Sequence, residues 1–161
     1  VNTEHFAKEV GEAVLHRIKT AGIDFSIKME RAPKTVTLDR ELMHSALLNI
    51  IENAVDACEK IQDSNIELKI IFSIEKTGKQ VTFNIKDNGT GMDTETRQKI
   101  FDLFFSKKGR KGTGLGLFIA NKIVQAHGGR IELESQEGVG TSFTIHIPLE
   151  RTQTQNDDPT A

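Results

Sequence analysis

Polar residues that could bind a ligand occur at three places in the sequence. Asn49 and Asn53 lie four positions apart, so they share one edge of a helix, although asparagine is only a moderate helix former. Asp87 has the parity of the buried face of a predicted strand, where an unpaired carboxylate is costly. Residues 112–117 place glycine at every second position before a predicted helix, and the free N–H groups at a helix start bind phosphates. Together these residues predict a site for one anionic ligand.

The elements that must position these residues centre on a helix predicted over residues 39–61. Asp39 can accept hydrogen bonds from the first free N–H groups of this helix, and Glu41 suits its positive end. One stripe of the helix is apolar at helical spacing and should face a core; it contains Met43, Ala46, Leu47, Ile50, Ala54, Ala57, Cys58 and Ile61. Asn49 and Asn53 lie along one edge of this stripe, at the boundary of the core.

The remaining patterns predict a mixture of helices and strands. Helices are predicted over residues 6–21 and from residues 112–117 to His127, where the helix dipole favours a histidine. Residues 92–111 show no sustained period and predict a mobile flap with aromatic anchors. Strands are predicted over residues 25–29, 36–38, 66–74, 81–85, 131–133 and 141–147. This order predicts an α+β fold, a two-layer α/β sandwich with one mixed, mostly antiparallel sheet and helices on one face.

Composition limits the classes of function. The chain has 161 residues, a formal net charge of −2 and both signs of charge throughout, which predicts no nucleic-acid surface and no direct membrane contact. The single cysteine, Cys58, excludes an intramolecular disulfide and favours a reducing compartment. No apolar run approaches the length of a membrane span. We therefore expect a soluble chain with one domain over residues 1–150 and a disordered polar tail over residues 151–161.

Five ordered motifs resemble those of the ATP-binding catalytic domain of bacterial sensor histidine kinases. They correspond to the N box, the first glycine box, the F box, the second glycine box and the closing strand of that domain. In this sequence they read Asn49-x-x-x-Asn53-Ala54, Asp87-x-Gly89-x-Gly91, Phe101-x-x-Phe104-Phe105, residues 112–117 and Gly140-Thr141-x-Phe143. The resemblance covers about residues 38–149. It implies the Bergerat α/β sandwich, which is shared with gyrase, heat-shock chaperone and mismatch-repair ATPases.

The resemblance also implies roles in binding ATP and magnesium. Asn53 would be the magnesium ligand and Asn49 its neighbour on the phosphate side, since a side-chain carbonyl suits a hard cation that takes other ligands from ATP. Asp87 would accept a hydrogen bond from the adenine amino group, and Thr141 would join that contact through water. Further contacts with the nucleotide are implied for Gly89, Gly91, Phe105, Lys108, Gly112, Thr113, Gly114, Leu115, Gly116 and Leu117.

Two positions depart from the pattern of this family. Leu103 stands where many of these kinases have a proline between the F-box phenylalanines, which affects the stiffness of the flap. Asp56 stands where many have a lysine, three residues after the second asparagine. This second departure removes one expected cation near the phosphates, and it makes Asn53 and the basic residues of the flap more important.

The resemblance predicts an enzyme whose phosphate acceptor is absent from this chain. The family phosphorylates a histidine on a helical dimerisation domain, where an acidic residue directly follows that histidine. None of the histidines here has that context: His5, His16, His44, His127 and His146. We therefore expect a cytoplasmic catalytic domain of a protein-histidine kinase, whether or not the parent protein is membrane-anchored. It would present the γ-phosphate of MgATP to the dimerisation domain, for onward transfer to a response regulator.

Two other functions remain as alternatives. A Bergerat-fold ATPase that moves a clamp by hydrolysis needs a glutamate as general base at the position of Asn49, and an amide is a poor base. Glu52, three residues further on, would point away from the nucleotide edge of the helix. A regulatory module that binds nucleotide without transferring phosphate has no such requirement, and the motifs alone leave it open.

Overall fold

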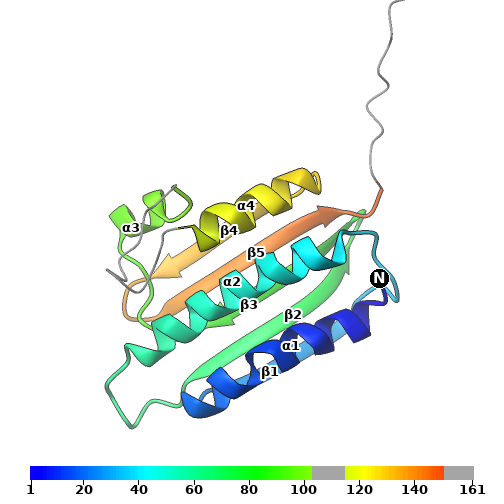
Figure 1. The fold of residues 1–161 in the computed structure, drawn as a ribbon. Coiled ribbons are helices and arrows are strands. Elements are labelled where there is room, and N and C mark those ends of the chain that lie inside the picture. The colour runs from blue at the N-terminus through cyan, green and yellow to red at the C-terminus, as the bar shows by residue number, and fades with distance from the viewer. Residues whose placement is uncertain (103–114, 151–161) are drawn as a thin grey trace, which may run out of the picture.

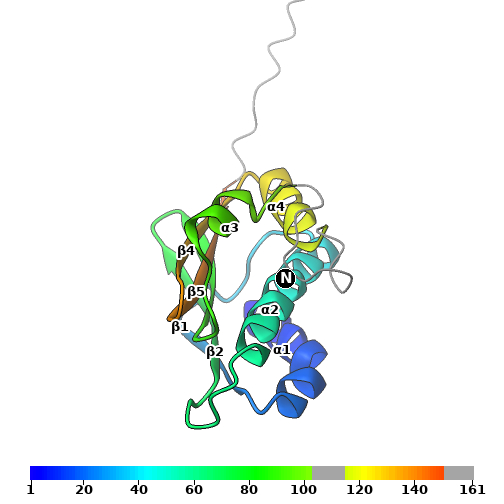
Figure 2. The same cartoon turned by 90° about the vertical axis from the view of Figure 1, so that its left-hand side faces the viewer.

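The chain folds into a five-stranded sheet with helices packed on one face (Figures 1 and 2). The computed structural model describes residues 1–102 and 115–150. In Figure 2 the sheet is seen from its side, and α1, α2 and α4 lie together beyond one of its faces. The elements in chain order are α1 (Thr3–Thr20), β1 (Asp24–Arg31), α2 (Arg40–Glu59), β2 (Lys69–Thr77), β3 (Gln80–Asp87), α3 (Thr94–Lys99), α4 (Gly116–Ala126), β4 (Arg130–Gln136) and β5 (Gly140–Pro148).

The sheet is mixed and mostly antiparallel, as predicted. Its strand order is β1-β2-β3-β5-β4, in which β1 and β2 are parallel and every other neighbouring pair is antiparallel. The register places Asp87, at the end of β3, opposite Thr141 at the start of β5. These two residues therefore meet at one end of the sheet, on the side where α3 follows in the chain.

The central helix α2 buries six of the eight residues of the predicted apolar stripe; Ala57 is only half-buried, and Ile61 lies beyond the end of α2 at Glu59. Asp39 is the N-cap and accepts a hydrogen bond of 3.0 Å from the backbone N–H of Leu42. In Figure 1, α2 lies between α1 and α4. Its buried side chains pack on the sheet and the two flanking helices; they are Met43, Ala46, Leu47, Ile50, Ile51, Ala54, Val55 and Cys58. Because α2 is held on three sides, its remaining edge has a fixed orientation toward the site described below.

His127 connects the end of α4 to the start of α2. The backbone N–H of Asp39 donates to its Nε2 at 2.9 Å, and its Nδ1 lies 2.7 Å from the carbonyl oxygen of Ile123. Since Nε2 accepts a hydrogen bond, the proton of the neutral ring is on Nδ1 and is donated to Ile123. The ring is buried. The prediction that the helix dipole accounts for this histidine is thus incomplete, because a neutral ring joins two helix ends here.

Two strand predictions need correction. Residues 36–38 form no strand; this segment instead meets the N-terminal residues through an isolated bridge between Asn2 and Thr35 and a 3.0 Å hydrogen bond from Val36 to Val1. The strand predicted from residue 66 begins at Lys69, and Ile66 is exposed. Residues 36–38 have no strand partner in the sheet, whereas the alternation from residue 66 continues into β2, which is paired only from Lys69 onward.

Part of the predicted flap forms the short helix α3. Asp93 caps it by accepting a 2.7 Å hydrogen bond from the backbone N–H of Thr96. After this helix, Phe101 packs edge-to-face on Phe143 of β5, with ring centroids 6.1 Å apart, which confirms one aromatic anchor. The other two F-box phenylalanines, Phe104 and Phe105, lie outside the described residues.

Within the described ranges, no helix combines the length and the apolar character needed to cross a bilayer.

Candidate functional site

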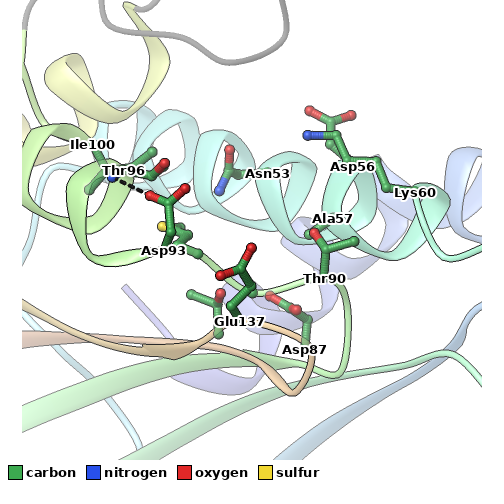
Figure 3. Close-up of a pocket in the computed structure, with 13 residues that line it drawn as sticks. Asn53, Asp56, Ala57, Lys60, Asp87, Thr90, Asp93, Thr96, Ile100 and Glu137 are labelled. Atoms are coloured by element: carbon green, nitrogen blue, oxygen red, sulfur yellow. Dashed lines mark hydrogen bonds between the residues drawn. The ribbon is translucent and has the colours of Figure 1, made fainter.

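A cavity of about 270 Å³ lies between α2, the end of β3, the loop that follows, α3 and the β4–β5 turn (Figure 3). Its lining includes four residues that the sequence placed near one ligand, namely Asn53, Asp87, Gly91 and Thr141. They come from three separate parts of the chain. The fold therefore brings the central helix and the first glycine motif to one site.

Asp87 is the buried carboxylate of this cavity. The residue is 5% exposed, and it accepts a 2.8 Å hydrogen bond from the backbone N–H of Gly89. Burial raises the pKa of Asp87 to about 6, against the opposing effect of backbone N–H groups of Gly89 and Thr141. An ionised carboxylate has more acceptor sites than these donors occupy, so it can also accept from a ligand.

Thr141 and Ser135 connect the strand ends around Asp87. Their hydroxyl oxygens are 2.8 Å apart, and the backbone N–H of Met92 donates to the Ser135 hydroxyl at 2.9 Å. Thr141 is buried and lines the cavity. The hydroxyl pair thereby fixes the loop after β3 against β4, a role for Ser135 that the sequence did not reveal.

Two glycines allow the loop after β3 to pack closely between its neighbours. A Cβ at Gly89 would lie 2.6 Å from the carbonyl carbon of Ala57 on α2, where the N–H of Thr90 also donates to the Ala57 carbonyl at 3.2 Å. Gly91 has φ +65°, and a Cβ there would overlap the carbonyl oxygen of Gln136. Packing alone thus requires these glycines. Their predicted approach to a bound base and sugar remains a prediction.

The two asparagines of α2 lie in different surroundings. Asn53 is half-buried and lines the cavity (Figure 3). Asn49, one turn earlier, faces the first turn of α4, because a Cβ at Gly116 would lie 3.5 Å from its Oδ1. Glu52 is exposed and does not line this cavity, as expected.

The predicted contacts on α4 are described only from its first turn. Leu115 and Gly116 are half-buried, and Leu117 is buried in the core. The other predicted contacts in this part of the chain lie outside the described residues: Phe105, Lys108, Gly112, Thr113 and Gly114.

A metal ion at this site would depend on the bound ligand for most of its coordination. Among residues 1–102 and 115–150, no group of three or more His, Cys, Asp or Glu side chains could hold a metal. The amide oxygen of Asn53 is a suitable single ligand for Mg²⁺, which usually keeps several waters and takes other ligands from phosphates. The cavity therefore fits a metal that arrives with an anionic ligand.

Three charged residues of the cavity lining were not predicted from the sequence: Lys60, Asp93 and Glu137. In the described part of its lining, four side chains are acidic and one is basic: Asp56, Asp87, Asp93, Glu137 and Lys60. The role of Asp93 as a helix N-cap could have been predicted, since an Asp followed within two residues by Glu is typical of a helix start. Glu137 could not, because it reaches the cavity from a turn that is distant in sequence.

Comparisons with known proteins identify the family of this chain. The profile of the family described as "Histidine kinase-, DNA gyrase B-, and HSP90-like ATPase" matches residues 38–151. Signal transduction histidine-protein kinase AtoS of Escherichia coli (strain K12) is 36% identical over 142 residues, which are 86% of this chain and 22% of AtoS. The chain thus spans less than a quarter of the length of this relative.

Solved structures of histidine kinases share the fold. The catalytic domain of histidine kinase ThkA has a TM-score of 0.78 at 31% identity, over 92% of this chain and 93% of that domain. ThkA in complex with response regulator protein TrrA has a TM-score of 0.72 at 28% identity, over 93% of this chain and 41% of that chain. With a family profile matched over more than half of its length, the chain belongs to the histidine kinase-, DNA gyrase B- and HSP90-like ATPase family.

Proposed function

We propose that this chain is the ATP-binding catalytic domain of a two-component sensor histidine kinase. It binds MgATP and presents the γ-phosphate for transfer to a histidine on a separate dimerisation domain. The observation that carries the proposal is the buried Asp87 carboxylate, which shares one cavity with Asn53 of α2. The kinship with AtoS and ThkA supports the kinase assignment over other members of the family.

The residues of the cavity suit the two ends of ATP. Asp87 would accept a hydrogen bond from the adenine amino group, with Thr141 beside it to hold a bridging water. Asn53 would hold Mg²⁺, which neutralises charge on the phosphates when it is bound. The first turn of α4 lies next to Asn49, which supports a phosphate contact for Gly116. The family resemblance alone carries the same proposal for the other residues of 112–117 and for Lys108. Catalysis then consists of positioning and charge neutralisation.

Hydrolysis by water is disfavoured by the same residues. In-line attack by water needs a general base, and Asn49 offers only an amide. Glu52 is exposed and absent from the cavity lining. His127 is buried with both ring nitrogens engaged, so it is unsuitable as a phosphate acceptor. These features support transfer to a histidine of another domain.

The proposal extends to the organisation of the parent protein. Residues 1–150 would form the catalytic domain and residues 151–161 a polar tail. A response regulator would receive the phosphate from the histidine, a partner supported by the ThkA–TrrA complex. The domain would lie in the cytoplasm.

One transfer experiment tests the proposal. The chain is incubated with γ-labelled ATP and Mg²⁺, with and without a separately produced dimerisation domain from the parent protein. We expect acid-labile label on the dimerisation domain, none on the chain alone, and little free phosphate. Rapid release of phosphate would favour a hydrolytic ATPase, and binding without transfer would favour a regulatory nucleotide-binding module.

A further inference from the structure

The carboxylate of Asp56 links the cavity to a helix that does not line it. Arg17 of α1 donates from Nη2 to Oδ1 of Asp56 and, at 3.4 Å, to Oε2 of Glu59. Asp56 belongs to the cavity lining, whereas Arg17 and Glu59 do not. The side chains of Arg17 and Asp56 are 38% and 21% exposed, so this ion pair is partly shielded from solvent.

The charge of the cavity makes this ion pair important for an anionic ligand. Acidic side chains outnumber basic ones by four to one in the described lining. A triphosphate carries several negative charges, and a carboxylate within a few ångströms of it repels it strongly in partly buried surroundings. Asp56 and Asn53 both line the cavity, so this carboxylate is near the proposed magnesium and phosphate position.

We propose that Arg17 is a positioning residue for the phosphate end of the nucleotide. It holds the carboxylate of Asp56 toward α1 and compensates its charge, so that this side of the cavity does not repel the phosphates. A cation from α1 thereby offsets the acidic residue that α2 carries at this position. The inference rests on the proposed function, because it requires that the cavity binds ATP.

A second ion pair between the same helices provides a matched control. Arg40 at the start of α2 pairs with Glu9 of α1, with side chains 52% and 25% exposed. Neither Arg40 nor Glu9 lines the cavity. Arg17→Met and Arg40→Met each remove one guanidinium from an α1–α2 ion pair and keep the apolar part of the side chain. Only the first variant removes a cation that pairs with a residue of the cavity lining.

Calorimetric titration of the chain with MgATP and with adenosine tests the proposal. We expect Arg17→Met to weaken MgATP binding roughly five- to tenfold, with a smaller effect at high salt. Adenosine binding should be unchanged, since adenosine carries no phosphate. Arg17→Lys should retain most of the MgATP affinity. Arg17→Met combined with Asp56→Asn should restore it, and Arg40→Met should leave both ligands unaffected.

The other outcomes would each overturn the inference. Equal losses for MgATP and adenosine would mean that Arg17 only maintains the shape of the cavity. A double variant as weak as Arg17→Met would mean that Arg17 acts on the phosphates directly and not through Asp56. MgATP binding that is indifferent to Arg17 would overturn this inference alone, whereas absence of MgATP binding by the unaltered chain would also overturn the proposed function.

Discussion

The backbone N–H of Gly89 donates a 2.8 Å hydrogen bond to the carboxylate of Asp87, two residues before it. This bond fixes the carboxylate while leaving it acceptor sites for a ligand donor. Adenine offers an amino group there and guanine a carbonyl oxygen, so GTP should bind more weakly than ATP by roughly 2 to 3 kcal/mol. Asp87→Asn should weaken ATP binding, because a neutral amide is a weaker acceptor. Calorimetry with both nucleotides measures these differences, with Glu134→Gln on the exposed side of β4 as control. Equal affinities for ATP and GTP would rule out this role for Asp87.

The same carboxylate should make stability and binding respond oppositely to pH. Burial raises the pKa of Asp87 from 3.8 to about 6, so the folded chain keeps a proton that the unfolded chain has lost between these pH values. Stability should therefore fall as the pH rises through this window, by roughly 2 to 3 kcal/mol for this group. In its proposed role as acceptor for adenine, Asp87 must be ionised, so ATP binding should weaken below about pH 6.

Asp87→Asn isolates this effect, because an amide does not titrate. The stability of the variant relative to the unaltered chain should rise by roughly 2 to 3 kcal/mol between pH 4 and pH 7. Urea unfolding at several pH values measures the difference, in which the other titrating groups largely cancel. A stability difference that is constant over this pH range would contradict the raised pKa of Asp87.

His127 should stabilise the contact between α2 and α4. Its replacement by Leu leaves the N–H of Asp39 without the acceptor that His127 provides, which should lower the free energy of unfolding by about 1 to 3 kcal/mol. His16→Leu, at an exposed position of α1, is the control and should change stability by less than about 0.5 kcal/mol. Similar effects of the two substitutions on urea unfolding would show that the hydrogen bonds of His127 contribute little.

Substitution of Gly91 and of Gly78 by alanine should distinguish the cost of steric overlap from that of backbone strain. Both have positive φ, but an added Cβ would overlap the Gln136 carbonyl at Gly91 and would have nothing within 4 Å at Gly78. Gly78→Ala should therefore cost about 1 kcal/mol, the usual strain of a left-handed alanine. Gly91→Ala should cost at least about twice as much and should also weaken ATP binding. Thermal unfolding and nucleotide titration of the two variants check this order.

The features that sequence could predict are those decided by local periodicity. Most of the buried face of α2 and the inward parity of Asp87 follow from the helical and strand repeats alone and are confirmed, although Ile51 and Val55 are buried outside the predicted stripe. The helical repeat also predicted that Asn53 lies at the edge of the apolar stripe of α2, and this position suggested a role in the site. Its proposed role with a metal remains a prediction.

The features that sequence could not predict depend on distant partners. Residues 36–38 have the composition of a strand, but their neighbours are the first residues of the chain and not the sheet. Ser135 and Glu137 reach the site only because the β4–β5 turn packs on the loop after β3, where Gly138 donates to the Thr90 carbonyl at 2.7 Å. The periodicity of apolar residues within one segment does not predict such tertiary contacts between distant segments.

Helix α1 and strand β1, which precede residue 38, belong to the same folding unit as the rest of the chain. The family profile begins at that residue, yet β1 pairs with β2, and Phe6 of α1 packs edge-to-face on Phe83 with ring centroids 6.4 Å apart. A chain that began at residue 38 would lack β1 and α1. Strand β2 would then be an edge strand with unpaired N–H and C=O groups, beside newly exposed apolar side chains. Exposed edge strands of this kind can pair with strands of other molecules. The shortened chain would therefore tend to aggregate even though it retained every nucleotide motif.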